Sequence, residues 1–199
     1  MPTRADALAL LFEHTQTEPL RRHGLAVEAV LRLAATRLGA DADLWGMTGL
    51  LHDFDYEGHP SEHPFWGRPI LEAAGYPPEL IRAIQGHAVF TGVGRDTDLA
   101  RWLFGCDELT GFVVAVALVH PTRSVAAVEP RSVRRKLRDR GFARSVSRSD
   151  IEAGMADLAF EPDVLIQFVI DGLATVAPII GLGDGRPQTA AEGPHLRSA

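Results

Sequence analysis

The stretch GLLHDFDY at residues 49–56 places a histidine and an aspartate side by side at the end of an apolar segment. Helical spacing puts His52 on one stripe with three earlier residues, Trp45, Thr48 and Gly49. Such a stripe normally faces the core of a helical protein. A His-Asp pair alone arises by chance in many sequences, so the meaning of His52 and Asp53 depends on the rest of the chain.

Three further side chains lie on core-facing stripes. His23 is in register with Val27, Val30 and Ala34; His87 follows Leu80 and Ile84; Asp107 lies with Ala100, Leu103, Thr110 and Val114. A single histidine of this kind is more often a hydrogen-bonded core residue than a ligand. A carboxylate facing a core, however, needs compensation, because its desolvation costs several kcal/mol. One divalent cation satisfies all of these groups, and the donors suit zinc, manganese, iron or nickel.

Helical spacing recurs along the chain and no alternating strand pattern is present, which predicts an all-α fold. We expect helices at about 5–14, 19–39, 43–53, 64–74, 77–87, 97–120, 131–140 and 149–159, and a last one from 162 onward. Residues 1–182 are predicted to form one domain. The Gly- and Pro-rich end, residues 183–199, is predicted to be a disordered tail.

The composition predicts a cytoplasmic protein without a membrane segment. The 199 residues are 46% hydrophobic, and the N-terminus shows no signal-peptide pattern. The single cysteine, Cys106, cannot form an internal disulfide. The apolar run 164–182 is interrupted by Gln167, Asp171 and Pro178, so it predicts a buried helix rather than a membrane span.

Charge is distributed unevenly. Residues 131–148 hold eight basic residues and one acid, whereas the rest of the chain holds 12 basic and 25 acidic residues. The acidic body argues against binding a nucleic-acid polymer, while the basic segment can meet a small anion. Lys136 is the only lysine of the chain, and we expect it to reach the anionic group of a substrate. The alternative is a solvated helix face, with Val133 and Leu137 turned inward.

The order His23, His52-Asp53, Asp107 resembles the signature of the HD superfamily. The surrounding strings fit as well: LRRHGLAV at 20–27, GLLHDFDY at 49–56 and FGCDELTG at 104–111. The resemblance covers roughly residues 20–120 and implies an HD-type helical bundle with additional C-terminal helices. In this family the matching residues bind one metal ion, which implies that role for His23, His52, Asp53 and Asp107.

Two later segments are similar to those of HD phosphohydrolases that hold two metals, including bacterial dinucleoside tetraphosphatases and cyclic-dinucleotide phosphodiesterases. The segments are HPFWG at 63–67 and AIQGHA at 83–88. The resemblance implies that His63 and His87 bind a second metal and that Asp53 bridges the two. We therefore expect one or two divalent ions per chain, with manganese, iron, zinc, nickel, cobalt and magnesium all open.

The resemblance implies a phosphohydrolase that attacks a small, nucleotide-like phosphoester with metal-activated water. We expect Asp53, His59 and Lys136 to act in catalysis, with His59, Glu57 or Glu62 giving a proton to the leaving oxygen. The same ligand set is compatible with two other functions. One is a mixed-valent di-iron oxygenase, and the other is a non-catalytic, metal-containing protein that binds a small molecule. The oligomeric state stays open.

Overall fold

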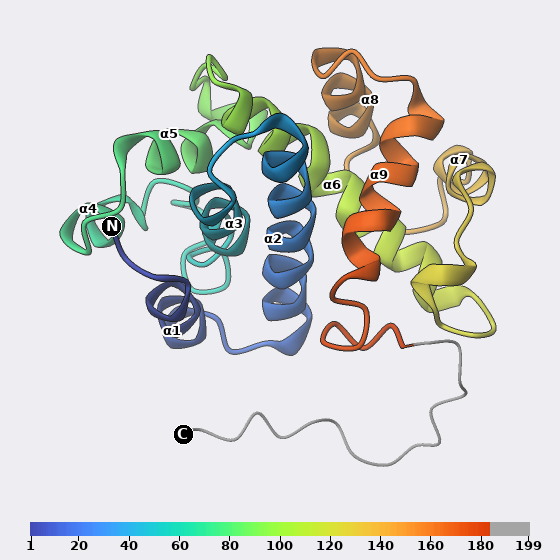
Figure 1. Cartoon of the computed structure of the whole chain (residues 1–199), viewed down its shortest axis with the longest axis horizontal. Helices are drawn as coiled ribbons and strands as arrows, with labels where there is room; N and C mark the ends of the chain where they lie inside the picture. Colours follow the sequence, from blue (N-terminus) through green and yellow to red (C-terminus); the bar gives the residue numbers. More distant parts are fainter. Residues whose placement is uncertain (184–199) are drawn as a thin grey trace.

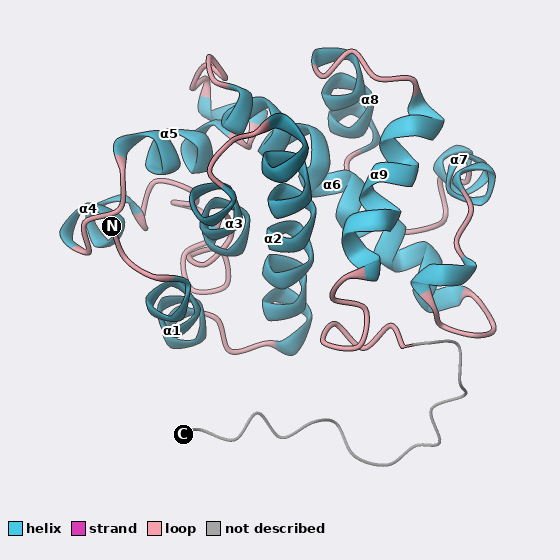
Figure 2. Cartoon of the chain, viewed as in Figure 1, coloured by secondary structure: helices cyan, strands magenta, loops and turns pink. Residues whose placement is uncertain are grey.

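The computed structural model describes residues 1–183, and these form helices, turns and loops without a strand (Figure 2). The helices are α1 (Arg4–His14), α2 (Glu18–Leu38), α3 (Ala42–Leu51), α4 (Arg68–Ala73), α5 (Pro78–Gly86), α6 (Asp98–Val119), α7 (Pro130–Arg138), α8 (Arg148–Asp157) and α9 (Pro162–Ala174), with short 3₁₀ helices η1 (Val89–Thr91) and η2 (Val125–Ala127). The predicted all-α class is confirmed. From residue 184 onward, the expected tail lies outside the described residues.

Several helix ends follow from local capping chemistry. The Asp41 side chain accepts hydrogen bonds from two backbone N–H groups at the start of α3, and Thr97 caps α6 in the same way. Helix α2 ends at Gly39, whose φ of 69° lies in the left-handed region. These caps fix where α2, α3 and α6 begin or end, and these helices carry most of the predicted metal ligands.

Two expected helices are shorter in the structure. Residues 64–67 form turns and α4 begins only at Arg68. The backbone N–H of Gly67, just ahead of this helix, donates to the carboxylate of Asp55 at 2.8 Å. The last helix ends at Ala174, and the remaining apolar residues up to Ile180 form turns that include Pro178. The prediction of a helix start at Pro64 was therefore wrong.

Helix α2 stands between two groups of helices (Figure 1). On one side, α1, α3, α4 and α5 surround a core that includes Leu11, Met47, Phe54 and Leu80. On the other side, α6 to α9 form a larger core with α2, which includes Val30, Leu103, Phe112 and Val169. Because α2 contacts α3, α6 and α9, it joins the two cores.

Helix α6 is the long, central helix of the larger core. By length and composition it is apolar enough to cross a membrane, but 61% of its most apolar stretch is buried inside the protein. Core helices of folded domains have the same composition. Its buried face includes Leu103, Cys106 and Phe112, which explains the apolar sequence without a membrane.

Two glycines let α2 and α3 approach each other closely. A Cβ atom on Gly49 would lie 2.9 Å from the backbone of Val27 and Glu28, and one on Gly24 would lie 2.8 Å from the carbonyl oxygen of Leu50. Both contacts are shorter than real Cβ contacts, so neither position has room for a side chain. Each glycine lies within three residues of a predicted metal ligand, so this approach brings the ligands of the two helices together.

We predict that Gly49→Ala lowers the free energy of unfolding by about 2 kcal/mol, because the backbone of α2 must move to admit the methyl group. For a chain of this size the melting temperature should fall by about 4–8 °C. Gly58→Ala is the matched control, since a Cβ there meets nothing within 4 Å. Equal melting temperatures for both variants, measured by circular dichroism, would contradict the tight approach.

Candidate metal centre

The fold brings all six predicted metal ligands to one place. His23 comes from α2, His52 and Asp53 from the end of α3, His63 from the following loop, His87 from the end of α5 and Asp107 from α6. The side chain of His52 is fully buried, while those of Asp53 and Asp107 keep 21% and 13% exposure. The centre is thus buried on one side and accessible on the other.

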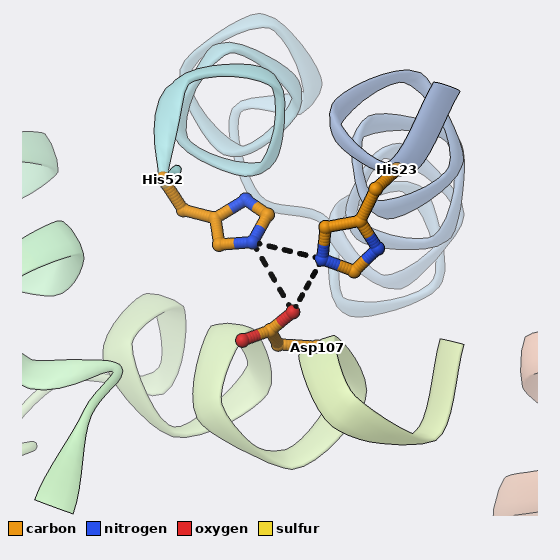
Figure 3. Close-up of side chains that lie close together, drawn as sticks. All are labelled: His23, His52 and Asp107. Carbon is orange, nitrogen blue, oxygen red and sulfur yellow. Dashed lines mark hydrogen bonds and ion pairs between the residues drawn. The ribbon is translucent and has the colours of Figure 1, made fainter. Parts of the chain in front are cut away.

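Three of these residues form one potential metal site, shown in Figure 3. Nε2 of His23 and Nε2 of His52 lie 3.2 Å apart. Both nitrogens approach Oδ1 of Asp107, at 2.8 Å from His23 and 3.1 Å from His52. The three ligand atoms therefore form a small triangle, contributed by three different helices.

The other three residues form a second potential site. Nε2 of His63 and Nε2 of His87 lie 3.3 Å apart, and each is 3.3–3.4 Å from Oδ1 of Asp53. The other carboxylate oxygen of Asp53, Oδ2, faces the first triangle, at 3.4 Å from Nε2 of His52. Asp53 thus directs one oxygen to each group, which is the arrangement expected of a bridging carboxylate.

Hydrogen bonds on the far side of three imidazole rings fix their orientation. Nδ1 of His52 donates to the carbonyl oxygen of Gly49 at 2.8 Å, and Nδ1 of His87 donates to that of Ile84 at 2.5 Å. Nδ1 of His63 lies 2.6 Å from Oδ1 of the buried Asp55. A carbonyl oxygen can only accept, so Nδ1 carries the hydrogen. In the neutral rings Nε2 therefore turns a lone pair toward the centre, as in metal-binding histidines.

The donor atoms fit a metal ion in both groups. Neutral His52 and His87 would each direct a lone pair at another imidazole nitrogen and at a carboxylate, so neither of these two rings supplies a donor to the centre. Two nitrogens at about 2.0–2.1 Å from one ion lie roughly 2.8–3.4 Å apart, from cis-octahedral to tetrahedral geometry. The observed separations of 3.2 and 3.3 Å match that spacing.

Protonation equilibria at the centre show the same need for positive charge. Burial lowers the pKa of His52, but the charges of Asp53 and Asp107 outweigh it and raise the pKa well above its ordinary value. For His87, burial is likewise outweighed by its hydrogen bond to Asp53, and the pKa rises. Burial raises the pKa values of Asp53 and Asp107, yet the adjacent histidines bring both below their ordinary values. A bound cation would replace these protons.

The centre opens into a cavity of about 700 Å³. Apart from the ligands, its wall includes the side chains of Tyr56, Phe90, Glu108, Ser145 and Asp150. Tyr56 is 49% exposed and Phe90 is 75% exposed, so two aromatic rings stand at an accessible part of the wall. The cavity is large enough for a small organic molecule.

His59 and Lys136 are placed away from this cavity. The His59 ring stacks on Trp66 with centroids 3.6 Å apart, and neither residue is part of the cavity wall. The ammonium group of Lys136 lies 4.7 Å from the centre of the Phe142 ring. Glu57 accepts hydrogen bonds from the backbone of Gln16 and Thr17 ahead of α2. These placements do not support the catalytic roles expected from the sequence.

Two carboxyl groups near the ligands were missed by the sequence analysis. Asp55 is buried, accepts from Gly67 and orients His63; its only signal was its place two residues after Asp53. Glu108 lies beside Asp107 and accepts a hydrogen bond from the backbone N–H of Ser147 at 3.1 Å. Burial, together with the charge of Asp107, raises the pKa of Glu108 to about 7.

Comparisons with known proteins identified one family. Residues 20–110 match the family model described as HD domain. No curated protein and no solved structure gave a match. The matched range includes all six residues of the metal centre, and helices α7 to α9 follow it. HD domains bind divalent metals and most of them are hydrolases. Residues 20–110 therefore constitute an HD domain, and helices α7 to α9 follow it within the described residues.

Proposed function

We propose that the protein is a metal-dependent phosphohydrolase acting on a small phosphoester. The observation that carries this proposal is the position of Asp53 between two groups of ligands at the floor of an accessible cavity. Two divalent ions bridged by a carboxylate supply Lewis acids and an activated water for attack at phosphorus. His23, His52 and Asp107 would hold one ion, His63 and His87 the other, and Asp53 both.

The cavity residues that are not metal ligands would contribute proton transfer and substrate contacts. Glu108 and Asp150 are the carboxyl groups of the described wall outside the ligand set, so we assign to them the transfer of a proton to the leaving oxygen. The exposed rings of Tyr56 and Phe90 offer faces for a planar leaving group, such as a nucleobase. This combination supports a nucleotide-like substrate.

The decisive experiment is a screen of the reconstituted protein for two reactions. Phosphate release from phosphoesters in the presence of manganese would support the hydrolase. Oxygen consumption by the iron-loaded protein, without phosphate release, would instead identify the mixed-valent di-iron oxygenase. The absence of both reactions would instead favour a binding protein. The screen is needed because the same six ligands are compatible with all three functions.

Replacing the shared ligand tests the centre as a whole. We predict that Asp53→Asn binds less than half of the metal of the wild type and loses about 100-fold or more in activity, because the amide removes a negative charge and one coordinating oxygen. Metal content is measured by elemental analysis after reconstitution. The control Asp98→Asn changes an exposed carboxylate at the start of α6. Full metal content in a folded Asp53→Asn protein would refute the proposal.

The number of ions is tested by His63→Ala. Because His63 belongs to the second group only, we predict that the metal content falls from about two to about one per chain. His120→Ala is the control, since His120 lies at the far end of α6 and bonds to Thr122. A content of one ion in the wild type, at saturating manganese, would exclude the two-metal centre.

A further inference from the structure

A second cavity, of about 870 Å³, adjoins the metal centre and is lined by arginines. Arg134 and Arg138 come from α7, Arg140 and Arg144 from the loop after it, and Arg148 from the start of α8. Glu152 is the acidic side chain among its described lining residues. The cavity therefore concentrates the positive charge of a chain whose formal net charge is −6.

Most of this charge is not neutralised within the described part of the protein. Arg134 forms an ion pair with Asp163 at 2.9 Å. No carboxylate of residues 1–183 lies within ion-pair distance of Arg138, Arg140 or Arg144. Like charges gathered in one concave surface repel one another and destabilise the fold. An anion bound in the cavity would remove that repulsion.

The loop that carries these arginines is held in place by Arg148. Its guanidinium donates to the carbonyl oxygens of Ala143 at 2.5 Å and Val146 at 2.9 Å, and also to that of Phe142. These acceptors are neutral, and no carboxylate among residues 1–183 forms an ion pair with Arg148. The backbone around Arg144 is therefore built into a fixed shape rather than left as a solvated run of charge.

The two cavities meet at this loop. Val146 lines both of them, and Ser145 and Asp150 belong to the wall of the metal cavity. Neighbouring side chains of one short segment thus face the metal centre and the arginines. The shared residue Val146 makes the two cavities neighbours.

We propose that the arginine cavity binds a phosphoryl-type polyanion. The planar guanidinium matches phosphate oxygens with paired hydrogen bonds, and the cavity is concave and of small-molecule size. Two sources share this chemistry: a second phosphoryl group of the substrate, or a separate anion that regulates the enzyme. The first source rests on the proposed phosphohydrolase function, whereas binding of the anion itself does not.

The test measures binding of tripolyphosphate to the full chain by calorimetry, after dialysis free of divalent metals. We expect saturable binding to the wild type and a loss of at least about 10-fold in affinity when Arg138, Arg140 and Arg144 are replaced together by Ala, since the charged hydrogen bonds to the anion are lost. The control replaces Arg123, Arg131 and Arg135, which are exposed and outside both cavities. Circular dichroism confirms that both variants are folded.

Binding that weakens equally in both triple variants would show a diffuse charge effect and overturn the proposal, as would the absence of saturable binding to the wild type.

The source of the anion is then resolved with the manganese-loaded protein. If the cavity variant loses at least about 10-fold in kcat/KM on a bisphosphorylated substrate but not on its monophosphate, the anion is part of the substrate. If tripolyphosphate changes the rate on the monophosphate without competing, it is a regulator. Tripolyphosphate binding without any phosphatase activity would contradict only the proposed function.

Discussion

The structure depends on one electrostatic constraint: carboxylate oxygens and the Nε2 atoms of His52 and His87 converge in a mostly buried space, where these two rings, when neutral, offer no donor. Nδ1 of His52 and Nδ1 of His87 donate hydrogen bonds to the backbone carbonyl oxygens of Gly49 and Ile84, so both rings direct Nε2 inward. The carboxylates of Asp53 and Asp107 meet these nitrogens. Such an arrangement is unfavourable unless positive charge fills it, either as protons on the histidines or as metal ions.

Helix packing produces this convergence. The contact of α2 with α3, made possible by Gly24 and Gly49, sets His23 against His52. Helix α6 packs against both and adds Asp107. Because α2 also joins the two hydrophobic cores, the ligand positions are tied to the packing of the whole domain. His23 and Asp107 lie within helices, whereas the other four ligands follow the ends of α3 and α5 or lie in the loop after α3.

Much of the centre could be predicted from the sequence because its ligands follow helical periodicity. His23, His52, His87 and Asp107 lie on apolar stripes, and caps such as Thr97 mark the helix that carries Asp107. Other features depend on tertiary contacts that no spacing reveals. His59 turns from the loop onto Trp66. The loop beside the arginine cavity is held by hydrogen bonds from Arg148 to backbone carbonyl groups. The run of basic residues could therefore be read from the sequence, but the cavity that they line could not.

The most direct measurement of the central claim is anomalous diffraction from crystals of the full chain grown with manganese. Two anomalous peaks about 3.5–4 Å apart are expected, one on each side of the Asp53 carboxylate. Coordination by Nε2 of His23 and His52 at one peak, and of His63 and His87 at the other, would establish the two-metal centre. A well-ordered crystal structure with all six side chains in place and no anomalous peak among them would contradict it.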